Sequence, residues 1–108
     1  MPYYDGNGNA LVEVGGLTPV AAAQTALTAA TDTPVLFAQR VRSYLIQNNT
    51  AGPVYRALDA PAGPGSLAIA AGTTFAETAS VTVLRLYAPG AATVNGATAG
   101  GIVVEGRV

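Results

Sequence analysis

The chain contains no cysteine, histidine, lysine or tryptophan, and only 10% of its 108 residues are charged. Without cysteine there is no disulfide framework, thiolate nucleophile or thiolate metal site, and without histidine the commonest metal ligand and general base is missing. The formal net charge of −1 provides no field that would hold a polyanion. We therefore expect no metal, no cofactor and no nucleic-acid partner.

Long hydrophobic runs are also missing. No stretch approaches the ~20 apolar residues that a membrane-spanning helix needs. The N-terminal sequence MPYYDGNGN has neither the basic region nor the apolar core of a signal peptide. These observations predict a protein that has no membrane partner and that is made in the cytoplasm without being exported.

Half of the residues are hydrophobic, but alanine alone accounts for 22 residues. Because alanine buries little apolar area, the core is weaker than the hydrophobic percentage suggests. The length is that of one domain, which usually has ~100 to 150 residues. We therefore expect a single domain that gains stability from partners.

From residue 33 onward, short β-branched and aliphatic segments alternate with turn sequences rich in Gly, Pro and Asn. The period of two is clearest near the C-terminus, where Ile102, Val104 and Val108 share one face and Glu105 and Arg107 share the other. This spacing predicts an all-β fold, a single compact antiparallel β-sandwich (jelly-roll- or Ig-like) of about eight strands within residues 20–108. The predicted strands are 34–38, 42–48, 54–59, 66–70, 73–78, 81–88, 92–95 and 102–108.

Residues 18–31 allow two interpretations. Thr18 followed by Pro19 and an alanine-rich stretch is typical of a helix N-terminus. Three observations favour a strand: Thr25, Leu27 and Ala29 alternate with Ala26, Thr28 and Ala30, threonine disfavours helix, and no apolar stripe forms at helical spacing. Propensity alone does not separate the two, although a strand suits the rest of the domain.

Residues 1–19 form a predicted N-terminal arm, rich first in Gly and Asn and then in short apolar segments. Fully extended at ~3.3 Å per residue, such an arm reaches ~60 Å, well beyond the ~13 Å radius of a small domain. We expect it to bind a partner, although a frayed terminus without a role fits the sequence equally well. The expected partner-binding residues are Tyr3, Tyr4, Leu11, Val12, Val14 and Leu17.

The sequence offers no catalytic constellation. Its six carboxylates are scattered singly, and no serine lies in a nucleophile-elbow sequence. The segment 5–9 resembles the start of a calcium loop, but Ala10 and Gly16 stand where that loop needs glycine and glutamate. The glycine-rich segment 96–101 lacks the lysine of a phosphate-binding loop. We therefore expect no enzymatic activity, no catalytic residues and no small-molecule substrate.

Three arginines are candidates for an interface. Arg40 and Arg42 share one side of a predicted strand, and arginine is enriched at interfaces because its planar fork binds carboxylates. Protection of a strand edge by charge is an equally good explanation. Arg85 lies in a segment, 83–87, that is apolar on both faces, which indicates a central strand or one covered by another chain.

The segment RVRSYLIQNNT at 40–50, followed by Pro53, Val54 and Tyr55, resembles small virion proteins of tailed bacteriophages and related gene transfer agents. The resemblance continues through a hairpin at 67–75 and a final strand at 102–105, and so covers residues 33–108. It implies a β-sandwich on the capsid exterior, most plausibly a head decoration (cement) protein made in the host cytoplasm, and it favours strand for residues 23–30.

The resemblance implies the major capsid protein as a partner. The alanine-rich composition and the segment around Arg85, which is apolar on both faces, indicate a symmetric oligomer of the chain, and a homotrimer is expected because shells have threefold positions. A cement protein stabilises a shell through contact area, which suits a rigid sandwich with a terminal arm. Other structural roles remain open, namely a head-fibre base, a tail component or a baseplate component. A host- or carbohydrate-binding module is an alternative from a different class, because β-sandwiches often bind sugars through their loops.

Overall fold

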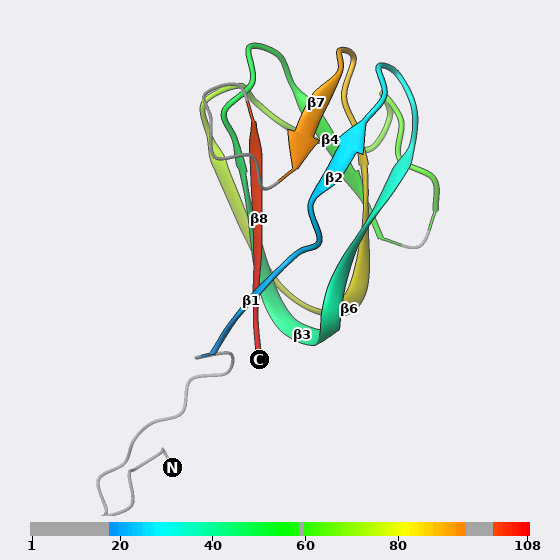
Figure 1. The fold of residues 1–108 in the computed structure, drawn as a ribbon. Helices are drawn as coiled ribbons and strands as arrows, with labels where there is room; N and C mark the ends of the chain where they lie inside the picture. Colours follow the sequence, from blue (N-terminus) through cyan, green and yellow to red (C-terminus); the bar gives the residue numbers. More distant parts are fainter. Residues whose placement is uncertain (1–17, 59, 95–100) are drawn as a thin grey trace, which may run out of the picture.

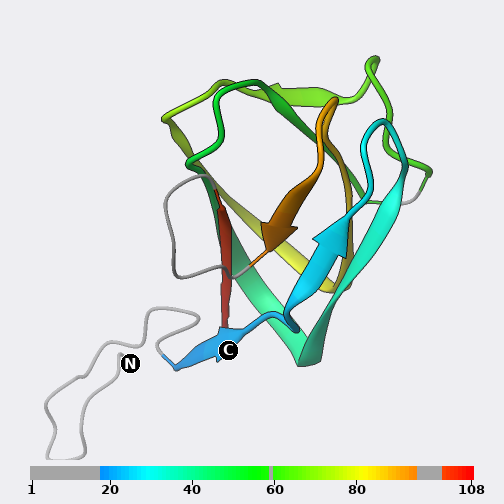
Figure 2. The same ribbon diagram turned by 45° about the horizontal axis from the view of Figure 1, so that its top comes forward.

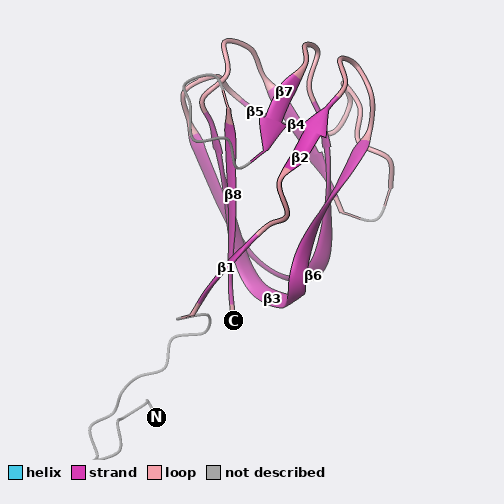
Figure 3. Cartoon of the chain, viewed as in Figure 1, coloured by secondary structure: helices cyan, strands magenta, loops and turns pink. Residues whose placement is uncertain are grey.

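The computed structural model describes residues 18–58, 60–94 and 101–108, and in these residues the chain is all-β, as predicted (Figure 3). It has eight strands and, within the described ranges, no helix. Residues 1–17, which make up most of the predicted arm, lie outside the described part. The strands are β1 (Pro19–Ala21), β2 (Thr25–Leu27), β3 (Thr33–Asn48), β4 (Val54–Ala57), β5 (Leu67–Ile69), β6 (Thr74–Tyr87), β7 (Ala92–Val94) and β8 (Ile102–Arg107).

The longest strands, β3 and β6, each join two segments that the sequence predicts as separate strands. The predicted break between 38 and 42 is wrong, and so is the break between 78 and 81. No glycine or proline lies between Val35 and Asn48, so the chain has no tight-turn residues there and bends through β-bulges instead. The pairing of β3 with β6 shifts register on either side of Val41.

Because β3 and β6 bend together, one hydrogen-bonded sheet folds into two layers. The strand order is β2-β7-β8-β3-β6-β4-β5, with β1 paired to β8. Figure 1 shows both long strands turning at the lower end of the molecule, beside the C-terminus. We call this end, residues 37–42 and 79–82, the bent end. Figure 1 and Figure 2 both show β2 and β7 side by side across the front.

The ambiguous segment 18–31 contains two short strands and no helix. Pro19, the last residue of the predicted arm, lies opposite Arg107 of β8, and β2 pairs with β7. Two pairs of predicted segments form the single strands β3 and β6. With β1 and β2, the described residues still contain eight strands, which is the number predicted. One pairing departs from the antiparallel pattern, because Val94 of β7 pairs with Ile102 of β8 in parallel.

The core lies between the layers, and the bulges determine which residues face it. Along β3 the buried positions are odd-numbered up to Val41 and even-numbered from Tyr44 onward, which is the phase change that a bulge produces. The predicted inward face of β8 is confirmed for Ile102 and Val104. The largest fully buried apolar side chains are Leu27, Val35, Val41, Ile46, Val54, Leu84, Leu86, Val94, Ile102 and Val104.

Gly106 allows β8 to pass close to the bent end. A Cβ atom built at this position would lie 2.5 Å from Val41 Cγ1 and 2.9 Å from Phe37 Cε1. Both neighbours are buried. The absence of a side chain at Gly106 therefore makes room for the two apolar residues that fill the inside of the bend.

The opposite end, where the loops 49–53, 70–73 and 88–92 gather, is organised by Asn48; we call it the loop end. Asn48 is fully buried, and its Nδ2 donates to the carbonyls of Gly52 and Ile69, both at 2.9 Å. Its Oδ1 accepts hydrogen bonds from the backbone N–H and the hydroxyl of Thr50 at 2.9 and 2.6 Å. One amide side chain thus fixes two loops, which gives a structural reason for asparagine at the end of the Ile-Gln-Asn sequence.

Candidate interaction surfaces

The carboxylates of the described residues do not form a reactive cluster. Asp32, Glu77 and Glu105 lie apart, and each has an arginine as its ion-pair partner. Within the described ranges there is no group of three or more acidic side chains that could hold a metal ion. In the same residues no helix is long and apolar enough to cross a membrane.

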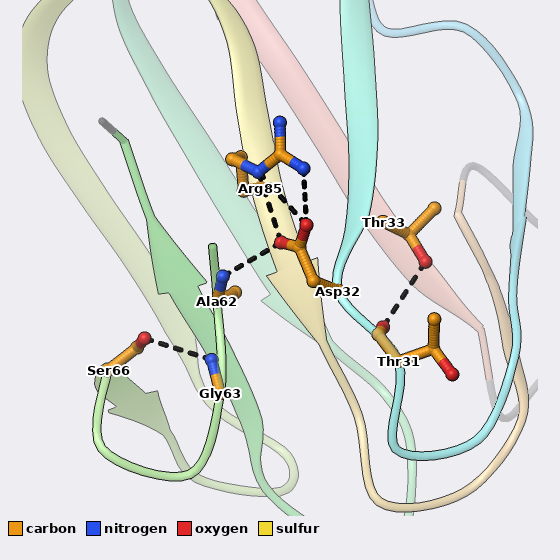
Figure 4. A network of polar contacts seen from close by, with 7 residues as sticks. All are labelled: Thr31, Asp32, Thr33, Ala62, Gly63, Ser66 and Arg85. Atoms are coloured by element: carbon orange, nitrogen blue, oxygen red, sulfur yellow. Dashed lines mark hydrogen bonds and ion pairs between the residues drawn. The ribbon is translucent and has the colours of Figure 1, made fainter. Parts of the chain in front are cut away.

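Arg85, one of the predicted interface residues, is held by Asp32 (Figure 4). Its Nε lies 3.1 Å from each carboxylate oxygen, and its Nη2 also donates to Oδ2. The carboxylate further accepts a hydrogen bond of 2.8 Å from the backbone N–H of Ala62. Asp32 precedes β3, Arg85 is on β6 and Ala62 is in the loop after β4, so this ion pair ties three separate segments together.

The Arg85 hydrogen bond lowers the pKa of Asp32 below its ordinary value of 3.8, and the Ala62 N–H contributes in the same direction. Burial opposes this shift and is the smaller influence. Asp32 therefore stays ionised down to acidic pH. The guanidinium of Arg85 is largely neutralised by its own chain, so the residue contributes less charge to a partner than the sequence suggests.

Around Arg85, the outer face of β3, β4 and β6 carries large side chains. Leu36 is opposite Val83 and is 51% exposed. Tyr55 is opposite Tyr87, and their rings meet edge to face with centroids 5.9 Å apart. We call the surface formed by Leu36, Tyr55, Val83, Arg85 and Tyr87 the tyrosine face. β6 lies between β3 and β4. The prediction of a central strand is therefore confirmed, and its second apolar face is partly open.

Arg40 and Arg42 lie at the bent end, and both are exposed. Nη1 of Arg40 donates to the carbonyl of Ser80 at 3.1 Å and lies 3.3 Å from its hydroxyl. Neither arginine forms an ion pair with a carboxylate of the described residues. Of the three predicted interface residues, Arg85 alone has a carboxylate partner among the described residues.

A polar network between the layers was not predicted from the sequence. Arg56 of β4 faces inward and lies 2.9 Å from Glu77 of β6, whose carboxylate also accepts a hydrogen bond from the Tyr44 hydroxyl. The guanidinium carbon of Arg56 lies 5.2 Å from the centre of the Phe75 ring. Burial, reinforced by Glu77, raises the pKa of Tyr44. Glu77 alternates in phase with Phe75 and Ala79, and this period of two is the signal that could have placed it inside.

The predicted partner-binding residues of the arm, Tyr3, Tyr4, Leu11, Val12, Val14 and Leu17, lie outside the described residues. Comparison of the chain with family models, with curated proteins and with solved structures gave no match. A function for this chain is therefore inferred from its surfaces and from the resemblance in its sequence.

Proposed function

We propose that the protein is a structural virion protein, a decoration (cement) protein that binds the outer surface of the major capsid protein shell and stabilises it. The observation that carries this proposal is the tyrosine face. It combines two half-buried tyrosines, an exposed leucine and an arginine neutralised by Asp32. Tyrosine and arginine are enriched at the centres of protein interfaces, where a few well-packed side chains provide most of the affinity.

The architecture supports this role. Two long strands run through both layers, and the loops at the loop end are fixed by Asn48, so the tyrosine face belongs to a rigid scaffold. A preorganised surface loses little conformational entropy on binding. On this proposal the protein is not an enzyme, works on the capsid exterior and assembles with further copies as a homotrimer.

The main test is binding to purified shells of the major capsid protein. We expect many copies per shell, quantified by gel densitometry, and a higher melting temperature of the decorated shells. Leu36→Asp places a charge in the tyrosine face and should lower occupancy at least tenfold, because a buried unpaired charge is strongly unfavourable at an interface.

Leu67→Asp is the matched control, because Leu67 is the other exposed large hydrophobic residue of the described part, at 42%. It is opposite Arg56 on β4, and neighbouring residues of a strand alternate between the two faces of the sheet, so Leu67 and Tyr55 lie on different faces. Occupancy should remain at the wild-type level in this variant. Equal loss in both variants, or wild-type occupancy in both, would contradict the role of the tyrosine face. Absence of the protein from intact particles would refute the proposed function itself.

The arm gives a second test of shell binding. Deletion of residues 2–17 should reduce occupancy if Tyr3, Tyr4 and the apolar residues of the arm anchor the protein. Undiminished occupancy would show that the arm has no role in attachment.

The alternative role in glycan binding is favoured by one feature, the half-exposed pair Tyr55 and Tyr87. Their edge-to-face arrangement, with an interplanar angle of 64°, presents a ring edge beside a ring face and so provides less stacking surface than two coplanar rings. Binding on a glycan array that is lost in Tyr87→Ala, together with no affinity for capsid shells, would favour this alternative.

A further inference from the structure

The two halves of β6 differ in their neighbours. Residues 85–87 lie between β3 and β4. Residues 74–78 pair with β3 on one side, and on the other side no strand of the described residues pairs with them. The first half of β6 is therefore an edge of the sheet, and we call residues 74–78 the free edge.

The hydrogen bonds at the end of β3 show which backbone groups bond with β6. Asn48 donates its N–H to the carbonyl of Thr73, just before β6, at 2.9 Å. The next residue, Asn49, donates to the carbonyl of Gly101, on the β8 side, at 3.0 Å. Backbone groups alternate in direction along a strand, so the even-numbered residues from 44 to 48 bond with β6 and the odd-numbered ones bond with β8.

The same alternation shows which backbone groups of the free edge point outward. Phe75 and Glu77 lie opposite even-numbered residues of β3, so their N–H and C=O groups bond with that strand. The outward-pointing backbone groups belong to Thr74, Ala76 and Thr78, and all three residues are exposed. The free edge thus presents a regular row of donors and acceptors to another strand.

The free edge lacks most of the features that usually protect an edge from strand pairing. Residues 74–78 contain no proline, glycine or basic residue, and the irregularity in the pairing with β3 comes after them, between Thr78 and Val81. An inward-pointing charge is a further protective feature, and Glu77 has this orientation. Its charge is matched by Arg56 at 2.9 Å, however, so it opposes pairing only weakly.

The inner side of the free edge contains a donor that lacks an acceptor. Nε of Arg56 is buried and has no hydrogen-bond partner among the described residues. The guanidinium carbon lies 5.2 Å from the centre of the Phe75 ring, and Nη2 binds one oxygen of Glu77. Because a buried donor without a partner is unfavourable, an added strand that brings an acceptor next to Phe75 is stabilised here.

From these observations we propose that the free edge pairs with the free edge of a second copy, antiparallel and about a twofold axis at Ala76. Ala76 then lies opposite Ala76 of the partner subunit, and Thr74 lies opposite Thr78 of the partner subunit. In each of these pairs both residues point their backbone groups across the contact, so each pair exchanges two N–H···O=C bonds. The threonine pairs add a favourable cross-strand contact on the outer face.

This register is also complementary on the inner face. Glu77 lies opposite Phe75 of the partner subunit, beside the partner's Arg56, and supplies a carboxylate as acceptor for the unpartnered Nε. Glu77 has 31% of its side chain exposed, so it is accessible to the second copy. By symmetry the contact forms twice, which favours a second copy over an unrelated strand.

The other in-phase registers are less favourable. A twofold axis at Glu77 places two carboxylates directly opposite each other, which is destabilising. An axis at Thr78 extends the pairing beyond residue 78, into the irregular part of β6. The axis at Ala76 alone keeps the contact within residues 74–78 and separates the like charges.

A twofold contact joins copies in pairs and is additional to the threefold contact of the proposed homotrimer. We therefore expect assemblies with an even number of copies, namely dimers of single chains or of trimers. The inference does not depend on shell binding, so it can fail while the proposed function holds, and the reverse.

The first test uses crosslinking of the full chain, which has no native cysteine. In Ala76→Cys the two introduced residues lie opposite each other, with Cα atoms ~5.5 Å apart, and a short bis-maleimide should link them. Thr78→Cys is the matched control, because the same register places its two copies ~14 Å apart along the strands. We expect at least about tenfold more crosslinked dimer for Ala76→Cys. Equal yields, or a higher yield for Thr78→Cys, would overturn the proposed register.

The second test uses analytical ultracentrifugation. Ala76→Pro removes an outward N–H, and proline at a free edge leaves the bonds to β3 in place. The dissociation constant of the pairing should rise at least about tenfold, whereas Ala76→Val, which keeps the N–H, should pair like the wild type. Only monomers or trimers of the wild type, or unchanged pairing of Ala76→Pro, would overturn the proposal.

A charge swap tests the contact without a proline. Thr74→Arg/Thr78→Arg places arginines opposite arginines and should abolish pairing, as should Thr74→Glu/Thr78→Glu. An equimolar mixture of the two variants should pair again, because opposite charges then face each other. Pairing of either variant alone, or no pairing in the mixture, would contradict the contact between Thr74 and Thr78 of the partner subunit.

Discussion

The two ends of the sandwich are stabilised in different ways. At the loop end, the fully buried Asn48 forms hydrogen bonds with the backbone of two loops and with Thr50. At the bent end, Phe37 and Val41 pack against Gly106, and the charged residues Arg40 and Arg42 lie outside. The comparison shows where polar and apolar interactions are each needed. Loops leave backbone groups to be satisfied, whereas a bent pair of strands leaves a volume to be filled.

Replacement of Asn48, which organises the loop end, should have the largest effect on stability. Asn48→Ala deletes two donated and two accepted hydrogen bonds and leaves the buried carbonyl of Ile69 without this donor. We expect a loss of about 3 kcal/mol in the free energy of unfolding, measured by urea denaturation. Asn49→Ala, at an exposed neighbour, should change it by less than about 0.5 kcal/mol. Equal effects in the two variants would contradict the role of Asn48.

A side chain at position 106 should have the next largest effect on stability. This substitution tests the close packing of β8 against the bent end. Gly106→Ala places a methyl group against Val41 and Phe37 and should cost about 2 kcal/mol. Val41→Ala in the same chain should recover part of this loss, because the two changes share one contact. Gly90→Ala, which meets no atom within 4 Å, is the control. Strictly additive effects of Gly106→Ala and Val41→Ala would argue against the close approach.

The network of Tyr44, Arg56 and Glu77 tests whether polar contacts also stabilise the fold away from the loop end. Tyr44→Phe removes the donor to Glu77 and should cost about 1 kcal/mol at pH 7. The folded pKa of Tyr44 is raised, so its contribution is complete below pH 10 and declines at higher pH, where only the unfolded tyrosine ionises. The stability difference between wild type and Tyr44→Phe should therefore narrow above pH 10. A constant difference would contradict this.

The smallest effect is expected on the outer surface, for the pair of Asp32 and Arg85. The folded pKa of Asp32 is lowered, so its stabilising contribution is complete above the ordinary value of 3.8 and is lost as pH falls through the folded pKa. The melting temperatures of wild type and Asp32→Asn should differ slightly at pH 7 and converge below pH 3.8. Because the pair is partly exposed, salt should reduce the difference at neutral pH. A larger difference at low pH would contradict the assignment.

Much of the fold could be predicted from local patterns, and the candidate surfaces only in part. Ile102 and Val104 face inward as predicted, because a period of two is a property of neighbouring residues. Arg85 was predicted as an interface residue without its partner, because Asp32 lies 53 positions earlier in the chain. The tyrosine face could not be predicted, because it depends on Tyr55 lying opposite Tyr87. That register is set by the pairing of β4 with β6.

The sequence by itself determined that the chain is all-β and where most of its strand segments lie, because alternation and turn residues act over a few neighbours. Only the tertiary structure decided that 34–38 and 42–48 form one bent strand and that Arg56 meets Glu77 inside. Both outcomes depend on the register between strands that are distant in the sequence. Register is fixed by the packing of the whole core, and therefore no local pattern contains it.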